Sequence, residues 1–195
     1  MKNYININKF GGWAIQESCF NLIKKILPEG KTILELGSGH GTDALSKHYN
    51  MISIENQPEW VGVYNSHYIE VPIRSYSHTQ INTVGLLSEV EEYTAPDLPG
   101  DGPKGTITPL QRGWYDYKIL SEKLKDLTYD LILIDGPNGS IGRGGFLKHL
   151  DLFNTDVPIV IDDISREPEK QLMIKLSKTI NRPYKELDWA TGYIL

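Results

Sequence analysis

Three alternating glycines after a short apolar segment form the stretch of this sequence with the clearest chemical use. Residues 33–42 read Ile-Leu-Glu-Leu-Gly-Ser-Gly-His-Gly-Thr, with an acidic residue, Glu35, just ahead of the glycines. Glycines let the chain turn tightly and let a ligand press against bare backbone. Dinucleotide sites use the spacing G-x-G-x-x-G, which places a pyrophosphate at a helix start. The order here, acidic-x-G-x-G-x-G, instead favours a cationic ligand group, because a carboxylate beside a pyrophosphate would repel it.

Three further carboxylates follow apolar segments: Asp135 comes after residues 131–134, and the pair Asp162-Asp163 comes after residues 159–161. If both segments are parallel strands, their carboxyl ends meet at the edge of the sheet where ligands bind. Carboxylates that converge there repel unless one is protonated or a cation lies between them. We therefore consider a metal site formed by Asp135, Asp162 and Asp163, with Asp135 also a candidate catalytic base. The alternative is that these residues only accept backbone N–H groups in the turns that follow.

The hydrophobic pattern predicts the elements that would position these residues. Apolar residues at helical spacing mark helices at about 14–27, 43–49, 117–127 and 145–153, and a further helix that contains Leu172, Leu176 and Ile180. Short apolar runs mark strands at 32–36, 51–54, 68–73, 130–134 and 158–161. Two short stretches follow at 184–189 and 192–195. Continuously apolar strands that alternate with helices indicate a parallel sheet covered on both faces. We predict a doubly wound, mostly parallel α/β fold that ends in an antiparallel hairpin.

Length and composition restrict the class of protein further. The chain has 195 residues and a net charge of −5, and its longest apolar runs have the length of strands. We expect a single domain over residues 1–195 without a membrane-spanning helix, which needs about 20 apolar residues. The acidic balance argues against duplex nucleic acid as a partner. Residues 1–9 lack the apolar core of a signal peptide and there is one cysteine, so we expect a cytoplasmic protein without disulfides or a multi-cysteine metal site.

In this setting, the glycine-rich stretch resembles the first motif of class I S-adenosylmethionine-dependent methyltransferases. The resemblance covers residues 10–195, because the strand before Asp135 and the C-terminal pair of strands also match that family's layout. It implies that S-adenosylmethionine binds between Gly37 and Glu55, with Glu35 beside the amino group of the methionine part. Glu55 closes the second strand, where the family has an acidic residue that accepts hydrogen bonds from both ribose hydroxyls. The residues expected at the cofactor are Glu35, Gly37, Ser38, Gly39, His40, Gly41, Glu55 and Asn56.

The carboxylates at the strand ends are similar to the metal site of small-molecule O-methyltransferases of the catechol type. In those enzymes an acidic residue after one strand and an Asp-Asn or Asp-Asp pair after the next hold a divalent ion such as Mg²⁺. The ion lowers the pKa of a substrate hydroxyl, so that the oxyanion can attack the sulfonium methyl group. The resemblance implies methyl transfer to an oxygen of a small molecule, for example a sugar hydroxyl. The chain has no Asn-Pro-Pro-Tyr-like sequence of the kind found in base amino-methylases.

Several residues near the predicted strand ends are candidates for the acceptor or cofactor pocket. Arg143 lies in a flexible loop and would bind an anionic or sugar acceptor; the alternative is a solvent-exposed loop arginine. The glycine–aromatic stretches 11–13 and 113–116 would either wall the acceptor pocket or pack the ends of helices. His40 would line the cofactor without proton chemistry, and Cys19 would belong to the core.

A long segment at about 77–112 interrupts the alternation of strands and helices. It is rich in proline and glycine, and a structureless loop of this length is uncommon inside a compact domain. It would emerge at the same edge of the sheet as the cofactor, so we consider a lid that excludes water from the acceptor site. The alternative is a surface excursion without a role.

Two other classes of function remain open from the sequence. An NAD-dependent oxidoreductase would also use Glu55 on a ribose, but the glycine spacing disfavours it and no Tyr-x-x-x-Lys pair is present. A non-catalytic domain would keep the fold as a binding module, yet it would have no need for both Glu35 and Glu55. Binding of NAD in preference to S-adenosylmethionine would favour the first of these classes.

Overall fold

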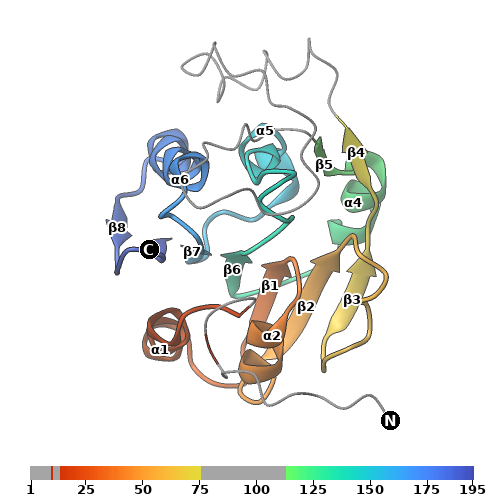
Figure 1. Ribbon diagram of the computed structural model, residues 1–195, viewed down its shortest axis with the longest axis horizontal. Helices are drawn as coiled ribbons and strands as arrows, with labels where there is room; N and C mark the ends of the chain where they lie inside the picture. Colours follow the sequence, from red (N-terminus) through yellow and green to blue (C-terminus); the bar gives the residue numbers. More distant parts are fainter. Residues whose placement is uncertain (1–9, 11–13, 76–112) are drawn as a thin grey trace.

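The computed structural model describes residue 10 and the ranges 14–75 and 113–195, and its centre is a seven-stranded sheet (Figure 1). The strand order is β3-β2-β1-β6-β7-β9-β8. Five strands pair in parallel: β1 (Thr32–Leu36), β2 (Asn50–Glu55), β3 (His67–Glu70), β6 (Leu131–Ile134) and β7 (Ile159–Ile161). The hairpin of β8 (Tyr184–Glu186) and β9 (Gly192–Ile194) adds to β7 in antiparallel orientation. The predicted doubly wound α/β fold with a C-terminal antiparallel hairpin is therefore confirmed.

Helices cover both faces of the sheet because successive side chains of the apolar strands point to opposite faces. On one face, α1 (Glu17–Ile26) and α2 (His40–Leu45) pack over a core that includes Cys19, as predicted. On the other face lie α4 (Tyr117–Leu124), α5 (Gly145–Lys148) and α6 (Glu167–Thr179), over a second core. Figure 1 shows these two groups of helices on opposite sides of the strands.

Three elements differ from the sequence-based expectation. Helix α2 begins at His40 rather than Asp43, because Thr42 Oγ1 accepts the N–H of Gly39 at 3.0 Å and closes the first turn directly after the glycines. The helix expected at 145–153 is α5 followed by a 3₁₀ turn at Leu150–Leu152. The strand expected at 68–73 divides at Pro72, which has no N–H to donate to a neighbouring strand.

Beyond Pro72, β4 (Ile73–Ser75) pairs with β5 (Gly113–Tyr115) in a separate two-stranded sheet. Trp114 and Tyr115 are both buried, and the Trp114 ring lies against Gly145, where any side chain would collide with it. The Tyr115 hydroxyl donates to the carbonyl oxygen of Ile54 at 3.3 Å. The structure therefore favours the packing interpretation of the aromatics at 113–116 over the pocket-wall interpretation.

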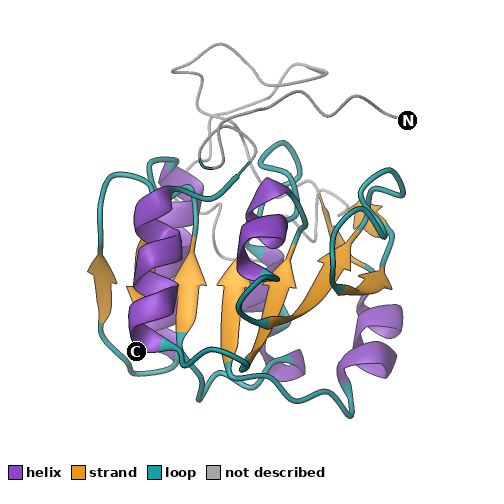
Figure 2. Ribbon diagram, turned by 90° about the horizontal axis from the view of Figure 1, so that it is seen from below, coloured by secondary structure: helices purple, strands orange, loops and turns teal. Residues whose placement is uncertain are grey.

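The direction in which the chain winds across the sheet reverses between β1 and β6. From β1 the chain continues outward through β2 to β3, whereas β6 and β7 continue outward on the other side of β1. In open α/β sheets, ligands bind at the carboxyl ends of the strands beside such a reversal. Figure 2 shows the arrowheads of the parallel strands at one edge of the sheet. That edge is where the candidate site lies.

Some predicted features lie outside the described residues. They are the insertion at 77–112 with its lid, the stretch 11–13, and the polar N-terminal residues 1–9. Within the described ranges, no helix combines the length and the apolar character needed to cross a bilayer.

Candidate functional site

The glycine turn after β1 makes close backbone contact with the turn after β6. Gly37 has a φ of +87°, which favours glycine, and its N–H donates to the Ile54 carbonyl of β2 at 2.8 Å. A Cβ atom on Gly136 would lie 2.6 Å from both the Cα and the N of Gly37. A side chain at Gly37 or at Gly136 would therefore collide with the backbone of the opposite turn. This contact lies where the winding reverses, which is the place where a ligand is expected.

Glu35 lies beneath the glycine turn and holds it in place. Its side chain is 1% exposed, and its Oε2 accepts hydrogen bonds from Thr42 Oγ1 at 2.8 Å and Ser53 Oγ at 2.9 Å. Burial raises the pKa of Glu35 to about 7, although these two hydroxyl donors act in the opposite direction. The structure thus connects Glu35 to both α2 and β2, and its placement beside a methionine amino group stays a prediction.

The raised pKa of Glu35 predicts how stability depends on pH. The folded chain holds this proton up to about pH 7, whereas the unfolded chain releases it near pH 4.5, the usual value for glutamate. Its contribution to the free energy of unfolding should therefore fall as pH rises from about 4.5 to 7 and stay constant above that range. Urea denaturation at pH 5 and pH 7.5 should show a smaller pH dependence in Glu35→Gln than in the parent chain. The matched variant Glu122→Gln, on the exposed surface of α4, should keep the parent pH dependence.

Glu55 ends β2 beside the glycine turn, as the sequence predicted. Its side chain is 3% exposed, and its Oε1 accepts the backbone N–H groups of Asn56 at 2.7 Å and Gln57 at 2.8 Å. Burial raises the pKa of Glu55, opposed by these N–H donors. The two backbone donors fix the orientation of the carboxylate at the end of the strand. Gly37 and Glu55 thus come together at the carboxyl ends of neighbouring strands.

Aromatic residues that the sequence analysis did not select pack against the glycine turn. The Tyr64 hydroxyl lies 2.6 Å from His40 Nδ1, and the Trp60 ring meets the His40 ring edge-on with 5.9 Å between centroids. Ser38 Oγ lies 3.1 Å from the Tyr68 hydroxyl. Trp60, Tyr64 and Tyr68 recur every four residues, a spacing that could have indicated one shared environment. The segment after Glu55 thus contacts the residues that the sequence assigned to the cofactor.

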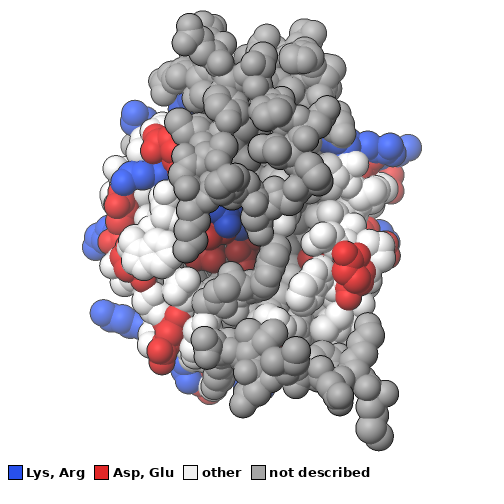
Figure 3. Space-filling view, viewed as in Figure 1, with Lys and Arg blue, Asp and Glu red and all other residues white. Residues whose placement is uncertain are grey.

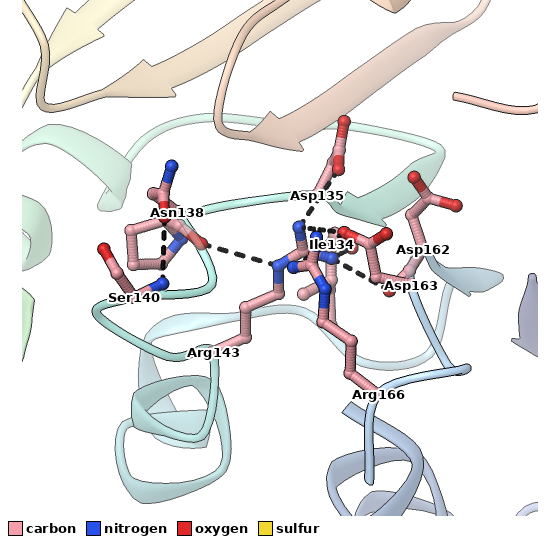
Figure 4. Close-up of polar contacts among 9 residues, drawn as sticks. Ile134, Asp135, Asn138, Ser140, Arg143, Asp162, Asp163 and Arg166 are labelled. Carbon is pink, nitrogen blue, oxygen red and sulfur yellow. Dashed lines mark hydrogen bonds and ion pairs between the residues drawn. The ribbon is translucent and has the colours of Figure 1, made fainter. Parts of the chain in front are cut away.

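The three carboxylates predicted at the strand ends come together in the structure. One oxygen from each of Asp135, Asp162 and Asp163 lies within 4.8 Å of the others (Figure 4). Acidic side chains gather near the centre of the face in Figure 3, with a basic group beside them. Asp162 is 6% exposed, and its Oδ1 has no hydrogen-bond partner among the described residues. Buried carboxylate oxygens without a donor are costly, so this atom is available to a cation or a proton.

Arg143 lies inside this cluster, so the expectation of a solvent-exposed loop arginine was wrong. Its side chain is 3% exposed, and Nη2 donates to Asp163 Oδ2 at 2.8 Å and to Asp135 Oδ1 at 3.2 Å. Arg166 contacts the same Asp163 Oδ2 through Nη1 at 3.0 Å (Figure 4). This burial could not be predicted from the sequence, because it depends on Asp163, which follows a different strand and lies 20 residues further along the chain.

The electrostatics of the cluster favour a bound cation. Burial raises the pKa of Asp135 to about 7 and that of Asp162 to about 8, and the Arg143 charge only partly opposes these shifts. Near neutral pH the carboxyl groups of Asp135 and Asp162 are therefore only partly ionised, and a further positive charge would favour their ionised forms. Hard divalent cations such as Mg²⁺ prefer oxygen ligands. Three convergent carboxylates, one with an unpartnered buried oxygen, fit such an ion.

No protein-family model matches the chain, and no curated protein matches it. Among solved structures, precorrin 8W decarboxylase from Methanobacterium thermoautotrophicum is similar, with a TM-score of 0.51 and 12% identity over 98% of this chain and 95% of that protein. Aeropyrum pernix fibrillarin with natively bound S-adenosylmethionine has a TM-score of 0.41 and 14% identity, over 87% of this chain and 68% of that one. The MycE methyltransferase of mycinamycin biosynthesis, in complex with Mg and SAH, has a TM-score of 0.44 and 11% identity, over 89% of this chain and 43% of that one. The first of these similarities supports the α/β fold, and at such identities it concerns the fold alone.

Proposed function

We propose that this chain binds S-adenosylmethionine at the carboxyl ends of β1 and β2 and transfers the methyl group to a small-molecule acceptor. The observation that carries the proposal is the contact of Gly37 with Gly136 beside the buried carboxylate of Glu55. Bare backbone at the winding reversal suits the methionine part, and a fixed carboxylate at the next strand end suits the two ribose hydroxyls. The sequence resemblance implies the same roles for Gly37 and Glu55.

In this proposal the residues of the glycine turn and of the end of β2 hold the cofactor. Glu35 holds the turn through Thr42, and the cationic methionine amino group would favour the ionised form of its carboxyl group. The turn residues Gly37, Ser38, Gly39, His40 and Gly41 line the methionine part, and Asn56 lies beside Glu55 at the adenosine. Bound S-adenosylmethionine supplies an electrophilic methyl group on a sulfonium.

The acceptor side of the proposal uses the carboxylate cluster. In the absence of an ion, Asp135 would accept the proton of the acceptor hydroxyl, whose oxygen would take the methyl group while the sulfur keeps the electrons of the broken carbon–sulfur bond. With no ion bound, a carboxyl group with a pKa of about 7 suits a base that works near neutral pH; as a ligand of an ion, Asp135 would not also take this proton. Asp135, Asp162 and Asp163 would hold a divalent cation such as Mg²⁺, which would lower the pKa of the acceptor hydroxyl. A sugar hydroxyl is the acceptor that we favour.

The net charge bears on the kind of acceptor that the chain would methylate. The acidic balance, with a net charge of −5, argues against duplex nucleic acid as acceptor. We propose a single domain over residues 1–195 that acts in the cytoplasm.

Isothermal titration of the full chain tests the proposal. S-adenosylmethionine and S-adenosylhomocysteine should both bind with dissociation constants on the order of 1–100 μM, in the range usual for enzyme ligands. NAD, titrated under the same conditions, should bind much more weakly. No heat from S-adenosylmethionine at about 1 mM, or tighter binding of NAD, would contradict the proposal and favour an oxidoreductase or a non-catalytic module instead.

A further inference from the structure

The guanidinium of Arg143 joins the ends of two neighbouring strands. Its shortest contacts are to the two residues after β7. Nη1 donates to the Asp162 carbonyl oxygen and Nη2 donates to Asp163 Oδ2, both at 2.8 Å. Toward β6, Nη2 donates to Asp135 Oδ1 at 3.2 Å. Longer contacts of 3.5 Å run from Nη1 to the Ile134 carbonyl and from Nε to the Pro137 carbonyl. All three nitrogens of the group thus point at acceptors of the protein itself (Figure 4).

These contacts remove Arg143 from direct recognition of an acceptor. The side chain is buried, and each guanidinium nitrogen already faces at least one protein oxygen. Arginine binds planar oxygen groups through a rigid fork of donors, so its position constrains every group that it contacts. Arg143 is therefore placed to orient other side chains rather than to bind an acceptor.

We propose that Arg143 is a positioning residue that fixes Asp135 and Asp163 relative to Asp162, so that the three carboxylates face one divalent cation. Nη2 holds one oxygen of Asp135 and one of Asp163 and leaves the second oxygen of each for the ion. Nη1 holds Asp162 by its backbone, which leaves the unpartnered Oδ1 of that residue free for the same ion. This inference rests on the cation in the proposed function.

The charges around Arg143 leave room for a further positive charge. Arg166 contacts the same Asp163 but is 44% exposed, and Glu169 of α6 is buried with no hydrogen-bond partner within the described ranges. Two guanidinium groups thus face four carboxyl groups, those of Asp135, Asp162, Asp163 and Glu169. Arg143 fixes the geometry of the cluster without neutralising it.

Titration of the full chain with Mn²⁺ as the probe tests this role. Residues that orient metal ligands typically change metal affinity by 10- to 100-fold when substituted. Arg143→Lys keeps the charge but loses the planar fork, and it should weaken Mn²⁺ binding by about 10-fold or more. The matched variant Arg166→Lys, which alters a partly exposed contact to the same Asp163, should change it by less than about fivefold. Calorimetry gives the affinities, and the electron paramagnetic resonance line shape of bound Mn²⁺ gives the ligand geometry.

The outcomes separate this inference from the proposed function. Equal Mn²⁺ affinity and an equal spectrum in Arg143→Lys would overturn the positioning role, and the methyltransferase proposal would stand. No Mn²⁺ binding by the parent chain would overturn both the cation and the positioning role, while S-adenosylmethionine titration still tests methyl transfer separately. If Arg143→Lys loses its native near-ultraviolet circular dichroism, Arg143→Ala is titrated at low temperature with added methylguanidinium. Recovery of Mn²⁺ affinity there supports the proposal, and a native spectrum without recovery refutes it.

Discussion

Replacement of Glu55 by glutamine is expected to weaken S-adenosylmethionine binding by about 10- to 100-fold while the chain stays folded. Hydrogen bonds to an ionised group are worth about 1.5–3 kcal/mol, and the proposed site uses this carboxylate for the ribose hydroxyls. Glutamine has nearly the same shape, and its carbonyl oxygen can still accept the N–H groups that Glu55 Oε1 accepts from Asn56 and Gln57. Calorimetric titration measures the affinity, and circular dichroism checks the fold.

The control for this variant is Glu59→Gln. Glu59 lies four residues further along the same segment and is exposed, so that its substitution removes the same charge from the same part of the chain. We expect less than about a twofold change in affinity for Glu59→Gln, because exposed charges in water interact weakly. Similar losses in both variants would mean that only general negative charge matters. No loss in Glu55→Gln would remove the ribose role and with it the main support for the cofactor site.

Local sequence patterns predicted the strands that build the site. The apolar run at 32–36 coincides with β1, and the runs before Asp135 and Asp162 end where β6 and β7 end. These strands are buried on both faces, so their residues are apolar apart from Thr32 and Glu35 in β1. Because the carboxyl ends of parallel strands share one edge, the meeting of the three aspartates followed from the fold class alone.

Contacts between distant segments were not predictable in this way. Arg143 is a charged residue in a glycine-rich loop, and its burial depends on Asp163, 20 residues away. Likewise, Pro72 divides the strand expected at 68–73, and the part after Pro72, β4, pairs with β5, some forty residues later in the sequence. In each case the contact that determines the local structure involves a residue far away in the sequence. Hydrophobic periodicity reports only on neighbouring residues and does not predict such contacts. Polar networks and small edge sheets thus need the three-dimensional structure.

The position of Gly136 is the clearest case of a packing constraint that the sequence does not reveal. It follows Asp135 in what reads as an ordinary turn. Only the structure shows that it meets Gly37, 99 positions earlier, at the point where the winding reverses. In the proposed function, the glycine motif would therefore form only part of the backbone surface at the cofactor, and the turn after β6 would form another part.

Substitution of alanine for Gly136 is therefore expected to damage both stability and cofactor binding. The added Cβ would meet the Cα and N of Gly37 at 2.6 Å and the Leu36 carbonyl oxygen at 2.8 Å. These are backbone atoms that no rotamer change can move, so the two turns must separate. Overpacking of this kind costs about 1–3 kcal/mol. For a chain of this size, that predicts a fall of roughly 2–12 °C in the melting temperature.

Separation of the two turns should also lower S-adenosylmethionine affinity, by about tenfold or more, because the turn that holds the methionine part moves. Gly62→Ala is the matched control: Gly62 has a φ of +75°, and a Cβ there would meet nothing within 4 Å. It should lose about 1–2 kcal/mol of stability from backbone strain but keep the parent affinity. Thermal melting and calorimetry on both variants distinguish the two effects. If Gly136→Ala loses stability yet binds S-adenosylmethionine as tightly as Gly62→Ala does, the turn after β6 forms no part of the cofactor site.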